Sequence, residues 1–299
     1  MTSLDAAAHP TPPEHPERPE GVGPRGEDRP GWLPWTAPVS LVAAFAAAFI
    51  AAILIGLVAV VAGSDIDDQP ASVSIVAVIV QDLCLIGAAL FFARLVSPPR
   101  PGQFGLRRPT TSTGRTLALV VGGYLAFILL SFAWLTAIGQ TDAEDTITES
   151  LGADESVVAA VAVAFLVTVL APIAEEFFFR GYFFGALRRL GLWPAVVLTG
   201  LAFGLVHVFG SPVAFLLPLA LLGGMLCLLR EWTGSLYPGI ALHCLNNSIA
   251  FASSQHWDWQ VPVLLVGAPA LIVLLRLWLG AWPALPVARR TPSESASSI

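Results

Sequence analysis

Charge is scarce in this sequence. Only 12% of its 299 residues are Asp, Glu, Lys or Arg, whereas 56% are hydrophobic, and the mean hydropathy is +0.75. Because about a quarter of the residues in soluble domains are charged, this composition excludes an ordinary soluble fold. Long apolar runs predict a polytopic membrane protein instead.

Lysine is absent, so 15 arginines carry all of the basic charge. We attribute this bias to the codon usage of a GC-rich genome, which favours a bacterial source. Cysteine is also rare. Cys84, Cys227 and Cys244 all lie in apolar runs, where thiols act as small packing residues, and no disulfide is predicted. No CxxC or HExxH pattern occurs, so the sequence contains no familiar zinc motif.

Eight apolar runs are long enough to cross about 30 Å of hydrocarbon as helices. They are roughly Pro38–Gly63, Ala71–Val96, Thr116–Gly139, Ser156–Phe179, Trp193–Phe209, Pro212–Leu229, Leu236–Ala252 and Val261–Trp282. The runs are continuous rather than alternating, which argues against the strands of an outer-membrane barrel. The predicted fold class is therefore all-α, a polytopic membrane bundle of about eight transmembrane helices.

Two polar tails flank the apolar region. Residues 1–34 are rich in Pro, Glu, Gly and Arg and contain too little apolar surface to fold alone. They also lack the apolar core of a signal peptide. We therefore predict a disordered tail over residues 1–34, a transmembrane domain over residues 35–283 and a second disordered tail over residues 284–299.

The distribution of charge along the chain predicts its orientation. The arginines precede the first run, lie between the second and third or at their ends, follow the fourth and sixth, or lie late in the eighth or beyond it. The loops on the opposite side contain acidic residues and no arginine. Because cytoplasmic loops carry the excess of positive charge, both termini are predicted to be cytoplasmic in a multi-pass protein of the cell membrane.

Three charged residues lie at the end of the fourth apolar run, where Glu175 and Glu176 are followed by Arg180 just after Phe179. Each charge at the centre of a membrane helix costs about 2.5–3.5 kcal/mol on insertion scales, so such clusters usually have a function. Glu176 and Arg180 are four residues apart in the favourable order and should form an ion pair. Glu175 points about 100° away, which makes it the freer carboxylate and the candidate general base. The alternative is that these charges only hold helices together.

The fourth helix is predicted to continue through Leu190, where Gly191 stops it and the next helix begins. Glu175 and His207 each lie 16 residues from Gly191, so both should be about 24 Å from the turn, at the same depth. His243 lies nine residues beyond Gly234, which gives a rise of only about 13 Å. These estimates agree only if the cytoplasmic end of the fourth helix projects into water.

Further polar residues occur in the second and seventh runs. His243 and Asn247 are four residues apart on one helical face, and both can donate hydrogen bonds to an oxyanion. An interhelical hydrogen bond is the alternative role. Asn246 lies on a different face and ranks lower. Gln81 and Asp82 lie near the middle of the second run, where a structural interhelical hydrogen bond is the favoured interpretation.

These residues resemble the motifs of the CPBP family of intramembrane proteases, also called the Abi or type II CAAX-protease family. The family pattern is E-E-x-x-x-R, then F-x-x-x-H, then H-x-x-x-N/D, each on a separate membrane helix. Here the three motifs are Glu175-Glu176…Arg180, Phe203…His207 and His243…Asn247. The resemblance covers about residues 156–253, and each motif is weak alone but specific in this order.

The resemblance implies an intramembrane endopeptidase. Glu175 and His207 would activate a water, His243 and Asn247 would stabilise the oxyanion, and Glu176 and Arg180 would order the site. Zinc or another divalent metal could be held by Glu175, His207 and His243, while a metal-free, glutamate-activated water is equally compatible. The expected partners are membrane lipids and a peptide or membrane-protein substrate, with no nucleic acid.

The sequence is also compatible with two other functions. One is a non-catalytic membrane protein for immunity or secretion that acts by binding, since some CPBP proteins are associated with immunity. The other is a transporter in which Asp82, Glu175 and Arg180 line a path for protons or solutes. The sequence shows no internal repeat of the kind common in transporters, which makes this third function the least favoured.

Overall fold

The computed structural model describes residues 30–66, 69–143 and 147–254, and every regular element in these ranges is helical. The longer helices are α1 (Thr36–Val61), α2 (Ala71–Arg94), α4 (Thr113–Ala137), α6 (Val157–Phe165), α9 (Leu192–Val206), α10 (Val213–Thr233) and α11 (Tyr237–Ser254). Short helices are α3 (Pro101–Phe104), α5 (Ile147–Ser150), α7 (Ala171–Glu175) and α8 (Phe184–Leu187). The prediction of an all-α membrane bundle is confirmed.

Six helices in the described ranges are long and apolar enough to span a membrane. They match the first six predicted runs, and the fourth extends without a break over Val157–Leu190, ending at Gly191 as predicted. The seventh run forms α11 but is not among the six, because its polar residues His243, Asn246 and Asn247 lower its hydropathy. The eighth predicted run, Val261–Trp282, and most of both predicted tails lie outside the described residues.

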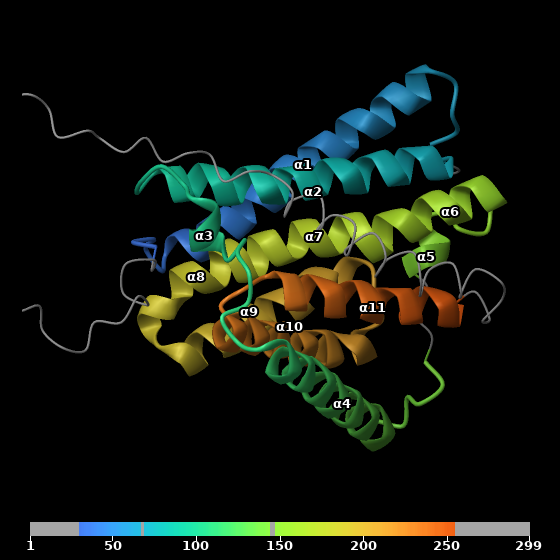
Figure 1. Cartoon of the computed structure of the whole chain (residues 1–299). Coiled ribbons are helices and arrows are strands. Elements are labelled where there is room, and N and C mark those ends of the chain that lie inside the picture. Colours follow the sequence, from blue (N-terminus) through green and yellow to red (C-terminus); the bar gives the residue numbers. More distant parts are fainter. Residues whose placement is uncertain (1–29, 67–68, 144–146, 255–299) are drawn as a thin grey trace, which may run out of the picture.

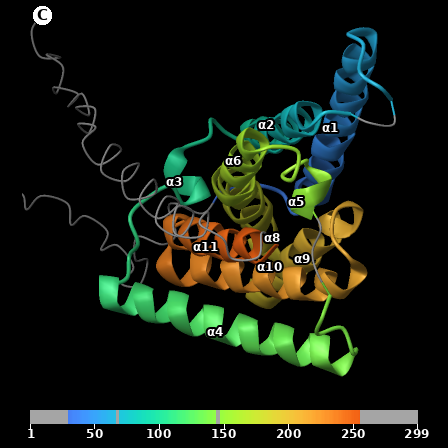
Figure 2. The same ribbon diagram turned by 90° about the vertical axis from the view of Figure 1, so that its right-hand side faces the viewer.

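The helix over Val157–Leu190 lies at the centre of the bundle (Figure 1). The α1–α2 pair covers one side of it, and α9, α10 and α11 lie on the other side. Helix α4 is outermost, packs on α10 and α11, and has no buried residue (Figure 2). Elements far apart in sequence therefore meet on the central helix, which carries Glu175, Glu176 and Arg180.

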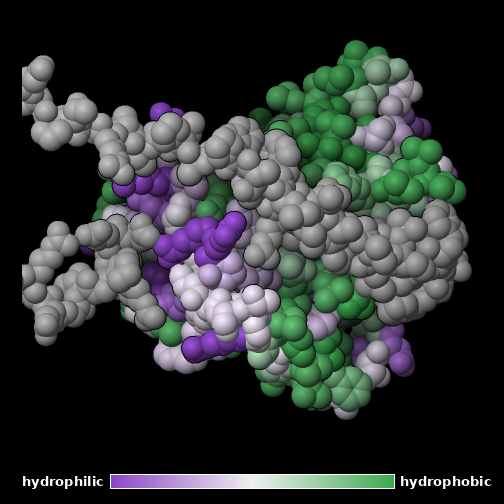
Figure 3. Space-filling view, in the orientation of Figure 1, coloured by the Kyte–Doolittle hydropathy of each residue, from purple (hydrophilic) through white to green (hydrophobic). Residues whose placement is uncertain are grey.

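The outer surface of the bundle is largely apolar. Large hydrophobic side chains such as Phe49, Leu129 and Leu205 are more than half exposed on the membrane-spanning helices. The visible face is green over much of α1 and α4, while its hydrophilic residues gather mainly toward one end (Figure 3). An apolar surface of this extent suits contact with lipid rather than water.

Helices α9 and α10 approach each other backbone to backbone through glycines. A Cβ added to Gly200 would lie 2.7 Å from the Ala220 carbonyl oxygen, and one at Gly223 would lie 3.0 Å from Cα of Gly200. A Cβ at Gly204 would lie 2.8 Å from Cβ and N of Ala220. Small residues four apart permit this close packing, which fixes the end of α9 that carries His207.

Replacing Gly204 with alanine is expected to lower the free energy of unfolding by about 1–3 kcal/mol, because the two backbones must separate to fit the methyl group. Denaturant titration of purified protein in detergent measures this change. Gly122→Ala in α4 is the matched control, since its Cβ would meet nothing within 4 Å. Equal stability of the two variants would contradict the packing described here.

Candidate active site

The central helix contains two π-helical segments, one before Glu175 and one that begins at Glu176. The segment η1 spans Leu166–Leu170, the short helix α7 spans Ala171–Glu175, and the segment η2 spans Glu176–Phe183. Pro172 lies between them and has no backbone N–H to donate, which favours a local departure from α-helical hydrogen bonding. π-Helical segments occur frequently at functional sites, where they re-aim side chains.

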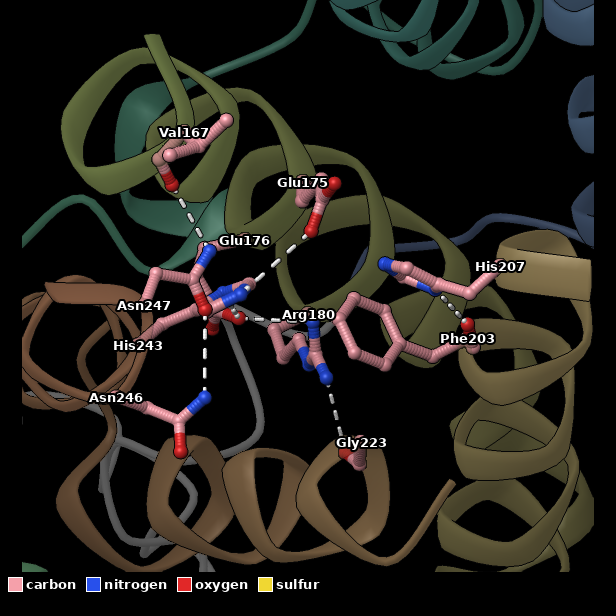
Figure 4. Close-up of polar contacts among 10 residues, drawn as sticks. All are labelled: Val167, Glu175, Glu176, Arg180, Phe203, His207, Gly223, His243, Asn246 and Asn247. Atoms are coloured by element: carbon pink, nitrogen blue, oxygen red, sulfur yellow. Dashed lines mark hydrogen bonds and ion pairs between the residues drawn. The ribbon is translucent and has the colours of Figure 1, made fainter. Parts of the chain in front are cut away.

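Glu176 and Arg180 form a fully buried ion pair, as their spacing predicts. Nη1 of Arg180 lies 2.8 Å from Oε1 of Glu176, and both side chains are at most 1% exposed (Figure 4). Nη2 of Arg180 donates to the Gly223 carbonyl of α10 at 3.2 Å. The guanidinium also lies 4.2 Å from the centre of the Phe203 ring, in cation–π geometry. This arrangement neutralises both charges inside the bundle.

His243 of α11 lies between the two glutamates and is buried. Its Nδ1 is 3.2 Å from Oε1 of Glu176, and its Nε2 is 3.7 Å from Oε2 of Glu175. Because the Glu176 carboxylate accepts, Nδ1 carries the hydrogen and donates it. These contacts bring His243 beside Glu175, although the two residues lie at different distances along their helices from the turns at Gly234 and Gly191.

Glu175 is the less confined of the two carboxylates. Its side chain is 16% exposed, whereas that of Glu176 is 1% exposed. In the described part of the chain, the one ion-pair contact of Glu175 is between its Oε2 and Nε2 of His243, at 3.7 Å. Arg180 pairs with Glu176 instead. The expectation that Glu175 is the freer carboxylate is therefore met by its geometry.

His207 lies at the end of α9, where a short 3₁₀ turn over His207–Phe209 begins. Its backbone N–H donates to the Gly204 and Leu205 carbonyls, and its Nδ1 lies 2.7 Å from the Phe203 carbonyl oxygen. Since a carbonyl can only accept, Nδ1 is the donor, which leaves Nε2 as the basic nitrogen of the neutral ring. In Figure 4 this nitrogen points toward Glu175, although no hydrogen bond joins the two described side chains.

The Phe203 ring packs between the rings of His207 and His243. Its centre lies 4.9 Å from the His207 ring, 5.6 Å from the His243 ring and 5.2 Å from the Phe179 ring. Sequence reasoning named Phe203 only as part of a motif and assigned it no role. Its position four residues before His207, on the same helical face, was the available signal.

The side-chain amide of Asn247 is held by two hydrogen bonds. Its Nδ2 donates to the Val167 carbonyl of η1 at 2.9 Å, and its Oδ1 accepts from Asn246 at 3.3 Å. Asn246 also accepts from the Tyr124 hydroxyl at 3.5 Å. One Nδ2 hydrogen of Asn247 thus satisfies a carbonyl of the distorted helix, a contact that the sequence did not reveal.

Gly239 is a second residue that sequence reasoning missed. A Cβ at this position would lie 2.9 Å from Oε2 of Glu176. That oxygen is buried and has no hydrogen-bond partner among the described residues. The absent side chain of Gly239 therefore leaves room for the Glu176 carboxylate between Arg180 and His243.

Glu175, His207 and His243 are the side chains that the sequence suggested as metal ligands. Catalytic zinc takes three protein ligands around one ion. Within residues 30–66, 69–143 and 147–254, no three His, Cys, Asp or Glu side chains are arranged to hold one ion. Nδ1 of His207 is bonded to Phe203, and Nδ1 of His243 is bonded to Glu176. Since these bonds leave Nε2 of each ring available, as in metal-ligating histidines, a divalent metal held by Glu175, His207 and His243 stays a prediction.

A family model described as type II CAAX prenyl endopeptidase Rce1-like matches residues 157–249. No curated protein and no solved structure gives a significant match to the chain. The matched segment contains all six predicted site residues and the whole central helix from the start of α6. Residues 157–249 therefore form an Rce1-like domain, and the resemblance of this segment to the CPBP protease family is confirmed.

Proposed function

We propose that this protein is an intramembrane endopeptidase of the cell membrane in which Glu175 activates the attacking water. The Rce1-like domain implies protease activity of the CAAX-protease type within a membrane. One observation carries the assignment of Glu175. It is the carboxylate of the pair that is not ion-paired with Arg180, and it faces ring nitrogens from α11 and from the end of α9.

The proposed reaction begins with a water between Glu175 and His207. Nε2 of His207 accepts a hydrogen bond from this water, and the Glu175 carboxylate takes a proton as the oxygen attacks the scissile carbonyl carbon. The carbonyl oxygen becomes the oxyanion of a tetrahedral intermediate. When that intermediate collapses, the C–N bond breaks and Glu175 returns the proton to the leaving amine. Atoms and charge balance without a metal ion.

His243 and Asn247 are the proposed donors to the oxyanion. Asn247 uses one Nδ2 hydrogen for the Val167 carbonyl, and the amide group has a second hydrogen that it can donate. His243 donates to Glu176 through Nδ1, so Nε2 faces the reacting groups, and it donates to the oxyanion in the imidazolium form, in which both ring nitrogens carry a hydrogen. Glu176 and Arg180 do not react in this proposal, because their role is to hold His243 and Phe203 in place.

Replacing Asn247 with alanine is expected to lower kcat by about 10²–10³-fold, the usual loss for one oxyanion donor. Its bond to Val167 contributes only about 1 kcal/mol to stability, as interhelical hydrogen bonds in membranes do. Kinetics of substrate cleavage and denaturant titration separate the two effects. Asn246→Ala is the matched control, and an equal loss of kcat in both variants would refute the oxyanion role.

The physiological substrate can be found by comparing membrane proteomes. Cells carrying wild-type protein are compared with cells carrying the Glu175→Gln, His207→Ala double variant. We expect one or more membrane-associated proteins to accumulate uncut in the variant cells, and purified wild-type protein to cleave them. If no protein accumulates while the cellular phenotype of the variant stays normal, a binding role such as immunity replaces the enzymatic proposal.

A further inference from the structure

Helix α2 places a third carboxyl group against the central helix. In the second half of α2, buried residues recur every three or four positions and form one face of the helix. They include Asp82, Leu85, Ala89 and Phe92. This face packs on α7 and η2, which carry Glu175 and Glu176. Apolar side chains fill the rest of the face, so Asp82 is the exception in a packed interface.

Asp82 lies at the level of Glu175. Helix α2 and the central helix run side by side in the same direction (Figure 1). Leu85 lies one turn after Asp82, Phe178 lies one turn after Glu175, and both belong to one buried cluster. The two carboxyl groups therefore lie at one level on helices that pack against each other, and no hydrogen bond joins them among the described residues.

Neither oxygen of the Asp82 carboxyl group has a hydrogen-bond partner among the described residues, and the residue is only 6% exposed. The interhelical hydrogen bond expected from sequence is therefore absent for Asp82 within the described part of the chain. Among the described residues, the one fully buried arginine near this face is Arg180, and it is paired with Glu176. An unpaired buried carboxylate is far more costly than a neutral carboxylic acid, so Asp82 holds a proton. Buried polar groups without protein partners are usually satisfied by water.

We propose that Asp82 is a positioning residue that holds a proton and, through it, an ordered water against Glu175. The protonated carboxyl group donates to the oxygen of that water and keeps it within reach of the base. This inference rests on the proposed function of Glu175 as the base. It adds to the site a side chain from α2, which lies outside the matched domain at residues 157–249.

The protonation state can be measured without any substrate. Infrared spectra of the purified protein at neutral pH should contain the carbonyl stretch of a protonated carboxylic acid. This band should be absent in Asp82→Asn and present in Gln81→Leu, a control one residue away on the same helix. The band should also persist in Glu175→Gln. If wild type and Asp82→Asn have the same spectrum in this region, the inference is wrong.

The positioning role is tested by kinetics with three variants. Asp82→Leu removes the polar group but fills the space, so the fold should remain stable, while kcat should fall about 10²-fold with little change in KM, as for a misplaced reactant. Asp82→Asn can still hold the water and should stay within a few-fold of wild type, like Gln81→Leu. Wild-type kcat in Asp82→Leu, or equal losses in the leucine and asparagine variants, would overturn the proposal.

The same variants distinguish a wrong role for Asp82 from a wrong role for Glu175. If Glu175→Gln retains wild-type cleavage, the proposed base is wrong, whatever the infrared spectra of the Asp82 variants show. If Glu175→Gln is inactive while the carboxylic acid band is missing from wild type, the base stands and Asp82 has no part in positioning water.

Discussion

Replacing Glu175 with glutamine is expected to lower the rate of peptide cleavage by about 10²–10⁴-fold, the range for loss of a general base. Glutamine has nearly the same shape but cannot take a proton from water. The Glu176–Arg180 pair and the bond from His243 to Glu176 do not involve Glu175, so they should survive the change. The variant should therefore fold normally and bind substrate with an unchanged KM.

Single-turnover cleavage of the substrate found by the proteome comparison measures this effect, because it reports the chemical step rather than product release. Glu149→Gln is the matched control. It is the same substitution on an exposed residue of the short helix α5. A Glu175→Gln protein that cleaves as fast as the Glu149→Gln control would contradict the assignment of Glu175 as the general base.

The second large effect is expected when the buried ion pair is broken from one side. Arg180→Met leaves the Glu176 carboxylate buried without its cation, and Glu176→Leu leaves the guanidinium of Arg180 without its anion. Removing one partner of a buried pair costs about 3–5 kcal/mol, because the remaining charge is uncompensated. Each single variant should therefore unfold at a much lower denaturant concentration than wild type.

The double variant Glu176→Leu, Arg180→Met should recover much of that stability, since two apolar side chains replace two charges in an apolar core. It should nevertheless remain inactive, because His243 loses the acceptor for its Nδ1. Denaturant titration of the four proteins gives the coupling energy of the pair. Additive losses of stability in the double variant would contradict a direct interaction between Glu176 and Arg180.

Much of the bundle could be predicted because helix length and apolar composition are local properties. Seven of the apolar runs are helices close to their predicted bounds, and the turn at Gly191 lies where a positive φ of 113° requires glycine. The Glu176–Arg180 pair was also predictable, since its members lie four residues apart on one helix.

Other parts of the site could not be predicted, because they depend on contacts between helices distant in sequence. The sequence paired His243 with Asn247, whereas the structure places His243 between the two glutamates and bonds Asn247 to Val167. The π-helical segments lack a reliable sequence signal. Glu155 belongs to the acidic loop between the third and fourth apolar runs, and its carboxylate accepts from the Ala71 N–H at the start of α2, a contact between segments distant in sequence.

By itself, the sequence determined that the chain forms membrane helices and that acid, imidazole and amide groups lie on the fourth, fifth and seventh of them. Hydropathy and spacing within one helix are enough for that, since both follow from a fixed rise and turn per residue. Only the tertiary structure decided that Phe203 bridges the two histidines, that Gly239 makes room for Glu176 and that Asp82 is buried in the helix that packs on α7 and η2. Those relations depend on how helices rotate and cross, which is set by side-chain packing over the whole bundle.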